Sequence, residues 1–325
     1  MKKVYIIFII FSFLSCNKIV REQPFENIDF KEEMRNFVIG INHYSKSFNP
    51  NFYIIPQNGI ELITQNGTES GNIHNTYIDA IDGQAQEGLF YGYEHDDEIT
   101  PTQITAYLKQ FLNKAKTNRK KILITDYCFT PSHIVDSYHK NNAEGYACFV
   151  ATSRELDLIP SITINNLNNN HIENLSDVQN FLYLINSHQY IDKSTFLSEL
   201  RATNYDLLII DAFFNDGTAF TRQDINALKY KTNGTRRLVI AYMSIGEAED
   251  YRYYWKQEWN TELPAWISME NPQWPGNYKV KYWEKEWQNI IYGDDDSYVK
   301  KIIESEFDGV YLDIIDAFEF FESRY

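Results

Sequence analysis

Short apolar runs that end on a carboxylate recur along this chain and restrict the folds that it can adopt. One run covers residues 121–126 (KILITD), another covers 206–211 (DLLIID) and a third covers 309–316 (GVYLDIID). A run this short, with apolar residues on both faces, is typical of a strand buried on both sides of a parallel sheet. Because parallel strands end at the same side of a sheet, the pattern predicts an acidic pocket at their carboxyl ends.

The run at Leu238–Tyr242 is followed by a turn that contains Gly246, Glu247, Glu249 and Asp250. An aromatic and polar segment follows the turn and continues to residue 259. In α/β barrels the catalytic side chains lie at this end of the strands. We therefore expect this turn to line a functional site.

Eight such strands are expected, with helices between most pairs of them. Alternation of strands and helices indicates either a (β/α)8 TIM barrel or a doubly wound sheet, both of class α/β. No glycine-rich fingerprint opens a helix after the first strand, so a dinucleotide-binding sheet lacks support. We favour the barrel, with strands near residues 52, 79, 121, 147, 180, 207, 238 and 310.

The order of the expected elements is unusual for a barrel. The chain begins with a helix over 31–48, in which Met34, Phe37, Val38 and Ile41 form one apolar stripe. It ends soon after the last strand, with no long helix to cover that strand. In a closed barrel the first helix would occupy this position, so the sequence predicts a circularly permuted barrel. Barrels tolerate such permutation because their termini lie close together.

The N-terminus resembles an export signal. Two lysines precede an apolar run that is too short to span a membrane, and Ser15 and Cys16 follow it. This resembles a bacterial lipobox, which predicts lipidation of Cys16; an ordinary signal peptide is the alternative. We expect a protein that is exported and lipid-anchored to a bacterial membrane or cell surface. The expected domains are a signal peptide at 1–15, a tether at 16–30 and one catalytic barrel at 31–325, with an Asn-rich insertion at 160–176.

Removal of the signal leaves 28 basic side chains against 45 acidic ones, a formal net charge of −17. Such a charge repels nucleic acid and attracts cationic ligands, so we expect no nucleic-acid partner. Cys128 and Cys148 are expected to be buried thiols rather than a pair. No zinc spacing is present, and we expect neither a metal site nor a cofactor.

Three segments of the C-terminal half resemble glycoside hydrolase family 114, the endo-α-1,4-polygalactosaminidase-like TIM barrels. They are YMSIGEAEDYRYYW at 242–255, WPGNYKVKYWEKEWQNII at 274–291 and FDGVYLDIIDAFEFFE at 307–322. Segments of the N-terminal half also resemble the family, although they would follow the C-terminal half in the usual order. They are NPNFYIIPQNGIEL at 49–62, YIDAIDGQAQEGLFYG at 77–92 and KILITDYC at 121–128.

The resemblance implies a TIM barrel that hydrolyses an α-linked amino-sugar polysaccharide. Together with the N-terminal signal, it leads us to expect a surface-anchored hydrolase that uses two carboxyl groups and retains the anomeric configuration. By matching position, Asp313 would be the acid/base and Glu87 the nucleophile. The chain departs from the family in its strand order and in the residues Gln84 to Gln86 that precede Glu87. The remaining expected substrate-binding residues are Asp211, Glu247, Asp126, Asp316, Tyr242, Tyr127 and Asn58.

Several carboxylates at one site would suit a cationic galactosamine polymer, because each acid raises the local concentration of cations. Two other functions fit the same residues. One is a glycan-binding lipoprotein on a barrel that has lost catalysis. The other is a hydrolase of a different linkage or a deacetylase-like enzyme, although the absence of metal-ligand spacing weighs against the deacetylase.

Overall fold

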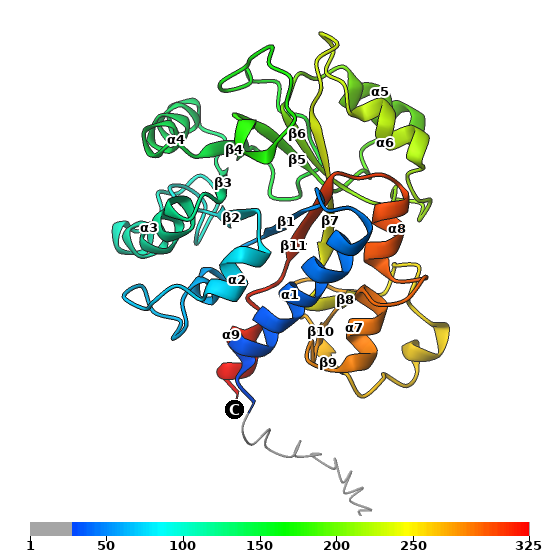
Figure 1. Ribbon diagram of the computed structural model, residues 1–325. Coiled ribbons are helices and arrows are strands. Elements are labelled where there is room, and N and C mark those ends of the chain that lie inside the picture. Colours follow the sequence, from blue (N-terminus) through cyan, green and yellow to red (C-terminus); the bar gives the residue numbers. More distant parts are fainter. Residues whose placement is uncertain (1–27, 325) are drawn as a thin grey trace, which may run out of the picture.

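The computed structural model describes residues 28–324 (Figure 1). The predicted signal peptide, the predicted lipidation site at Cys16 and nearly all of the predicted tether lie outside the described residues. None of the helices within 28–324 is both long enough and apolar enough to cross a membrane.

Parallel strands form the centre of the molecule, as predicted for class α/β. They make two parallel sheets, one in the order β1-β11-β7-β6-β5 and one in the order β2-β3-β4. The strands are β1 (Tyr53–Pro56), β2 (Gly83–Glu87), β3 (Lys121–Tyr127), β4 (Ala147–Ala151), β5 (Phe181–Leu184), β6 (Leu207–Asp211), β7 (Leu238–Ser244) and β11 (Gly309–Asp313).

The two sheets meet at both of their edges. At one junction, Gln57 and Ala85 form a parallel bridge that places β1 beside β2. At the other, the rings of Phe149 on β4 and Phe181 on β5 contact each other at 5.8 Å. Within residues 28–324, no ladder of hydrogen bonds joins β4 to β5. The neighbouring strands therefore follow the chain order from β1 through to β11, which again lies beside β1.

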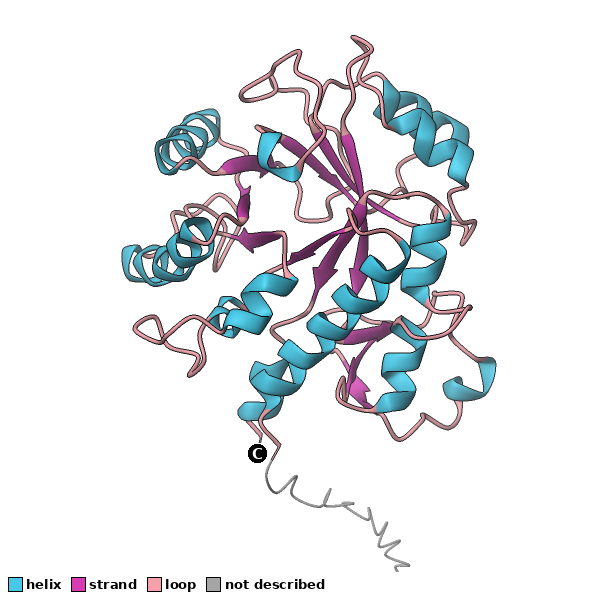
Figure 2. Ribbon diagram, in the orientation of Figure 1, coloured by secondary structure: helices cyan, strands magenta, loops and turns pink. Residues whose placement is uncertain are grey.

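Helices surround these strands on the outside of the molecule (Figure 2). They are α1 (Phe30–Phe48), α2 (Asn75–Ala80), α3 (Thr102–Thr117), α4 (Pro131–Glu144), α5 (Lys193–Arg201), α6 (Arg222–Leu228), α7 (Lys285–Ile291), α8 (Tyr298–Glu304) and α9 (Ala317–Glu322). The short 3-10 helices are η1 (Ile60–Ile63), η2 (Leu175–Asp177) and η3 (Gln257–Asn260).

The first helix forms where the apolar stripe predicted it. Asp29 caps α1 by accepting a hydrogen bond from the backbone N–H of Glu32 at 2.9 Å, and the stripe from Met34 to Ile41 is buried. At its start, Phe30 packs on Phe321 of α9 with ring centroids 5.6 Å apart. Because α9 directly follows β11, the two ends of the described chain lie together near the carboxyl ends of the strands (Figure 1).

One predicted strand was misplaced. Residues near 79 belong to helix α2, whose first turn is capped by the His74 ring accepting from the Tyr77 N–H at 3.2 Å. The strand follows it as β2, which reads GQAQE. Apolar patterning misses this strand because its glutamines are polar, yet both Gln84 and Gln86 are buried and donate to neighbouring carbonyl groups.

Residues 260–280 contain two further strands. Strands β9 (Ile267–Glu270) and β10 (Asn277–Val280) pair antiparallel, and β10 pairs on its other edge with β8 (Glu247–Glu249). This small sheet lies beside α7 (Figures 1 and 2). It connects the Gly246 turn to the rest of the C-terminal half.

The Asn-rich segment connects β4 to β5 without an α-helix. Its asparagines bond to residues near the amino ends of the strands: Asn168 donates to Asp206 at 2.9 Å, and the Asn170 carbonyl accepts from Lys231 at 3.1 Å. The segment therefore packs against the amino-terminal side of the strands.

Candidate active site

A cavity of about 520 Å³ opens at the carboxyl ends of the strands. Most of the side chains predicted from the sequence to form the site line this one cavity, although they come from both sheets. They are Asn58, Glu87, Tyr127, Asp211, Tyr242, Glu247 and Asp313. Two further predicted residues, Asp126 and Asp316, do not line it.

Asp313 is the last residue of β11. One carboxylate oxygen accepts a hydrogen bond from the Ile314 N–H at 2.8 Å, and the other accepts from the Tyr242 hydroxyl at 2.8 Å. Burial, followed by the nearby Glu87 carboxylate, raises the pKa of Asp313 to about 8. At neutral pH this carboxyl group therefore holds a proton that it can donate.

The turn after Asp313 is strained. Ile314 has a φ of +57°, a left-handed conformation that is unfavourable for a β-branched residue. Its carbonyl oxygen packs against the opposing turn so closely that a Cβ at Gly246 would lie 2.1 Å from it. Glycine is therefore needed at position 246, and the close approach holds the Ile314 N–H beside the Asp313 carboxylate. Strain of this kind is typical of functional sites.

Glu87 ends strand β2 and faces the same cavity. The Tyr127 hydroxyl on β3 donates to its Oε1, and the Asn58 side-chain oxygen accepts from the Glu87 N–H at 3.1 Å. Burial raises the pKa of Glu87, while Tyr127, Arg154 and the amides of Gln57 and Asn58 lower it. The carboxylate of Glu87 thus has several groups that favour its charged form.

The two carboxyl groups act on each other through the cavity. The charge of Glu87 is the second cause, after burial, of the raised pKa of Asp313. When two acids share a buried site, repulsion between their charges separates their pKa values, so that one remains protonated while the other ionises. The structure thus brings together Glu87 and Asp313, which lie in different halves of the sequence.

Asp211 ends β6 and forms an ion pair that the sequence did not predict. Arg252 donates from Nη1 to Asp211 at 2.7 Å and from Nε to Glu249 at 2.5 Å. Both carboxylates and the guanidinium group line the cavity. Arg252 follows the Gly246 turn in the segment EAEDYR, so its nearness to two acids in the sequence was the available signal.

Glu247 is almost fully buried. Its Oε1 accepts from the Asn271 side chain at 2.9 Å and from the Lys279 ammonium group at 3.0 Å. Asn271 lies between β9 and β10, and Lys279 lies on β10. The small antiparallel sheet therefore holds this carboxylate at the cavity wall.

The structure contradicts the prediction that Asp126 binds substrate. Its fully buried carboxylate accepts from the backbone N–H groups of Phe90 and Tyr91 at 3.0 and 3.3 Å, and from Ser137 and Asn141 on α4 at 2.7 and 3.1 Å. The reason is strand alternation: successive side chains point to opposite faces, and on β3 it is Tyr127 that faces the cavity.

Asp316 was also predicted to bind substrate, but it lies outside the cavity lining. The chain has already turned toward α9 at this residue, which is the N-cap of that helix. Burial, followed by Glu319 and Glu87, raises the pKa of Asp316 to about 7. Its charge in turn contributes to the raised pKa of Asp313.

Arg154 is a further cavity residue that the sequence gave no signal for. Its guanidinium group lies over the ring of Tyr127, 3.9 Å from the centroid, and donates to the Gly92 carbonyl at 2.6 Å. Since Tyr127 donates to Glu87, this cation supports the nucleophile candidate through the tyrosine.

Cys128 and Cys148 are free and buried, as predicted. Within residues 28–324, no group of three or more His, Cys, Asp or Glu side chains is placed to hold a metal ion.

Comparison with known proteins connects the C-terminal half to one family. Residues 185–324 match the glycoside-hydrolase family GH114. The match includes Asp211, Glu247, Arg252 and Asp313, whereas Glu87 lies outside it.

The chain is also similar to uncharacterized proteins of three organisms. One from Methanocaldococcus jannaschii is 41% identical over 160 residues, which cover 48% of this chain and 43% of that protein. One from Thermotoga maritima is 39% identical over 122 residues, which cover 38% of this chain and 36% of that protein. One from Deinococcus radiodurans is 38% identical over 130 residues, which cover 40% of this chain and 39% of that protein. This chain thus matches less than half of the length of each of these relatives.

Proposed function

Because residues 185–324 belong to glycoside hydrolase family GH114, we propose that this protein hydrolyses glycosidic bonds with the carboxyl groups of Asp313 and Glu87. One observation carries the proposal. A carboxyl group with a pKa raised to about 8 faces the same cavity as a second buried carboxylate whose charge contributes to that shift. Glycoside hydrolysis requires such a pair, one member protonated and the other ionised.

In the first step the Asp313 carboxyl group donates its proton to the glycosidic oxygen as the bond to the leaving sugar breaks. The Glu87 carboxylate attacks the anomeric carbon and forms a glycosyl ester. The Tyr127 hydroxyl and the Asn58 amide hold Glu87 for this attack.

In the second step the ionised Asp313 removes a proton from water, and the water oxygen attacks the anomeric carbon. The ester bond to Glu87 breaks, which regenerates both side chains and retains the anomeric configuration. Tyr242 donates to Asp313 and stabilises its charged form between the two steps.

GH114 enzymes are TIM barrels, and we propose that residues 31–325 form one such (β/α)8 barrel. The order of neighbouring strands from β1 to β11 and back to β1 supports closure, as do the contacts at the two sheet junctions. The contact of Phe30 with Phe321 joins the first and last helices of the described residues, which supports a circularly permuted order.

We propose a cationic, α-linked amino-sugar polysaccharide as the substrate, of the galactosamine type. The support is the composition of the cavity, where carboxyl groups outnumber guanidinium groups by six to two and Asp313 is the one expected to hold a proton at neutral pH. The acids are Glu87, Glu155, Asp211, Glu247, Glu249 and Asp313, the guanidinium groups are those of Arg154 and Arg252, and His188 also lines the cavity.

We also propose export and anchoring through a lipid on Cys16, for which the support is the sequence of the first 16 residues. Metabolic labelling with a fatty acid tests this directly. Label that is lost from the Cys16→Ser variant supports lipidation, and label that remains on it excludes this residue.

The experiment that tests the catalytic proposal is incubation with a panel of amino-sugar and neutral polysaccharides, with release of oligosaccharides as the readout. We expect cleavage of an amino-sugar polymer by the natural chain and none by Asp313→Asn or Glu87→Gln. An NMR spectrum of the first products, recorded before mutarotation, distinguishes retention from inversion. A fully active Asp313→Asn variant would overturn the assignment, and binding without cleavage would favour the glycan-binding alternative.

A further inference from the structure

Trp274 differs from the other tryptophans that the structure describes. Each of the others packs against at least one aromatic ring; they are Trp255, Trp259, Trp266, Trp283 and Trp287. Within residues 28–324, Trp274 makes no such ring contact, and its side chain is 47% exposed. The indole lines the same cavity as Asp313 and Glu87.

The turn that carries Trp274 is held by its own backbone. It joins β9 to β10, strands of the small antiparallel sheet beside α7 in Figure 1. The Asn271 carbonyl accepts from the Trp274 N–H at 3.2 Å, and the Trp274 carbonyl accepts from the Asn277 N–H at 3.0 Å. Hydrogen bonds on both sides of the indole therefore fix the chain that carries it.

A glycine closes this turn. Gly276 has a φ of +87°, and a Cβ there would lie 2.9 Å from the Asp250 carboxylate. Its N–H donates to Glu270 at 2.9 Å, and its carbonyl accepts from the Asp250 N–H at 2.9 Å. The turn is thus locked against the segment that follows β8, on the cavity side of the sheet.

The same turn is connected to a cavity carboxylate. Asn271 begins it and donates to Oε1 of Glu247, which also accepts from Lys279. Both donors reach this one oxygen, and in the described part of the chain Oε2 receives no hydrogen bond. An exposed indole and a carboxylate oxygen with capacity for a donor are therefore held by one rigid turn.

A ligand in the cavity would account for this arrangement. Leaving a large aromatic side chain in water forgoes the free energy of burying it; Trp259, Trp266 and Trp287 are buried, and Trp255 and Trp283 are partly buried. Sugar rings present an apolar face of C–H groups and a polar rim of hydroxyl or amino groups. An indole face covers the first, and a carboxylate accepts from the second.

We propose that Trp274 is a platform on which one pyranose ring of the polysaccharide stacks, at a position beyond the two sugars joined by the cleaved bond. Glu247 accepts a hydrogen bond from the polar rim of the same sugar. That the ligand is a saccharide rests on the proposed function, whereas the evidence for a platform is the exposed indole and the hydrogen-bonded turn that carries it. The site therefore binds at least three sugars, and longer chains bind more tightly than a disaccharide.

The test measures affinity for saccharides of increasing length in the full chain carrying Asp313→Asn, which prevents turnover. The probes are α-1,4-linked galactosamine oligosaccharides, and calorimetry gives the dissociation constants. We expect Trp274→Ala to weaken binding of the longest oligosaccharide roughly tenfold, the loss of about 1.4 kcal/mol of stacking. Binding of the disaccharide stays unchanged, and Trp274→Phe retains part of the affinity.

A matched control comes from an aromatic residue of similar exposure outside the cavity. Tyr230 is 56% exposed and does not line the cavity. Tyr230→Ala should leave affinity for every oligosaccharide unchanged. Since both side chains are exposed, neither substitution should lower the melting temperature by more than a few degrees.

The outcomes separate the two proposals. If the natural chain cleaves the polymer while Trp274→Ala binds every length as tightly as its parent, the platform is overturned and the proposed function stands. Equal weakening for the disaccharide and the longest chain also overturns the platform, because it places Trp274 at the cleaved bond. If the natural chain neither binds nor cleaves any of these saccharides, the proposed function fails and the platform falls with it.

Discussion

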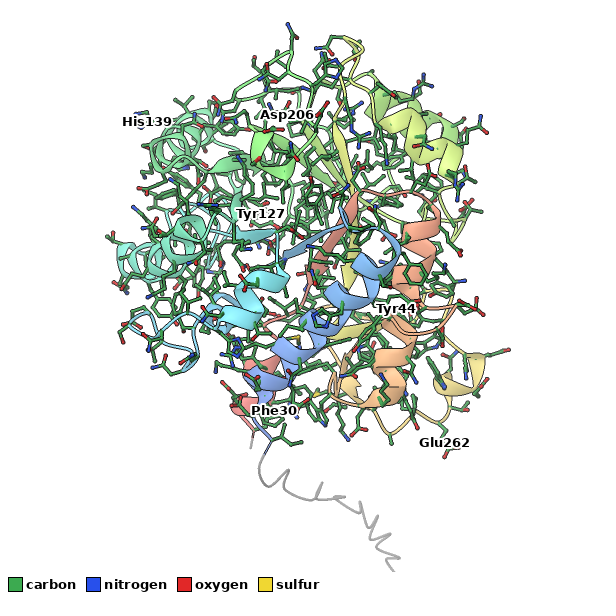
Figure 3. The ribbon with its side chains drawn as sticks, in the orientation of Figure 1. Phe30, Tyr44, Tyr127, His139, Asp206 and Glu262 are labelled. Atoms are coloured by element: carbon green, nitrogen blue, oxygen red, sulfur yellow. The ribbon has the colours of Figure 1, made fainter. Side chains whose placement is uncertain are left out.

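The acids that precede strands at the amino ends and the two catalytic candidates at the carboxyl ends have opposite surroundings. At the amino ends, each acid that directly precedes a strand has a cation as its partner. Asp206, labelled in Figure 3, pairs with Lys231 at 2.5 Å, and both side chains are fully buried. Asp308 pairs with Lys229 and Arg236, each at 2.9 Å, and also accepts from the backbone N–H of Val239.

At the carboxyl ends, the catalytic candidates have tyrosine hydroxyls as partners. Tyr242 donates to Asp313, and Tyr127, also labelled in Figure 3, donates to Glu87. Within residues 28–324 neither acid forms an ion pair with a lysine or arginine. Burial without a paired cation raises the pKa of both carboxyl groups.

The comparison teaches that the presence or absence of a paired cation decides what an acid at a strand end contributes. At the amino ends, paired acids tie neighbouring strands together and stabilise the fold. At the carboxyl ends Asp211 is also paired, with Arg252. The two acids without a paired cation, Asp313 and Glu87, reduce stability and are the proposed proton donor and nucleophile. Functional sites commonly trade stability for reactivity in this way.

The largest expected difference between the two ends is in catalysis. Replacing the proton donor in Asp313→Asn, or the nucleophile in Glu87→Gln, should lower kcat by a factor on the order of 10³ to 10⁵. Asp206→Asn removes a charge of the same type at the amino end and should leave kcat of the folded protein unchanged. Steady-state rates normalised to the folded fraction make this comparison. Equal losses at both ends would show that the distinction is wrong.

The next largest effect is on stability, and it is expected at the amino ends of the strands rather than at the carboxyl ends. Lys231→Met leaves the Asp206 carboxylate buried without its cation, which should lower the free energy of unfolding by about 3–5 kcal/mol. Denaturation in urea measures this value. The double variant Asp206→Asn/Lys231→Met should recover part of the loss. A single variant as stable as the natural chain would contradict a structural role for this pair.

A smaller effect concerns pH and Asp313. Its folded pKa of about 8 lies above the usual value near 3.8, so the folded state holds a proton that the unfolded state has released between these pH values. Stability from this group is therefore present at low pH and is lost as the pH rises through 8. Asp313→Asn should stabilise the protein by about 1–3 kcal/mol at pH 9 and leave its stability near pH 3 unchanged.

Thermal melts of the Asp313→Asn variant across this pH range measure the effect. The matched variant Asp308→Asn, which loses a paired acid at the amino end, should destabilise the protein at pH 9. A stabilising effect of both variants would remove the contrast between the two ends.

The smallest effect separates the two members of the catalytic pair. The hydrogen bond from Tyr242 lowers the pKa of Asp313, and the hydrogen bond from Tyr127 lowers that of Glu87. Tyr242→Phe should therefore move the alkaline limb of the kcat/KM profile upward, and Tyr127→Phe should move the acidic limb upward, each by up to about one pH unit. A shift of the same limb in both variants would contradict the assigned roles.

The sequence predicted most of the fold from local patterns. Buried parallel strands such as β6 and β7 show apolar runs, and α1 shows an apolar stripe with a capping aspartate, because one face or both faces of these elements must leave water. The pattern failed at β2, where buried glutamines take the place of apolar residues and bond to backbone carbonyls. A buried polar strand gives no periodic signal to predict.

By itself, the sequence determined which strands end on acids, and hence that acids gather at one end of the sheets. Only the tertiary structure decided which of them face the cavity. It turned Asp126 toward α4 and Tyr127 inward, brought Arg252 between Asp211 and Glu249, and placed Glu87 near enough to Asp313 to raise its pKa. The physical reason is that strand alternation has no fixed direction until neighbouring elements pack, and a pKa depends on burial and on charges that lie far away in the chain.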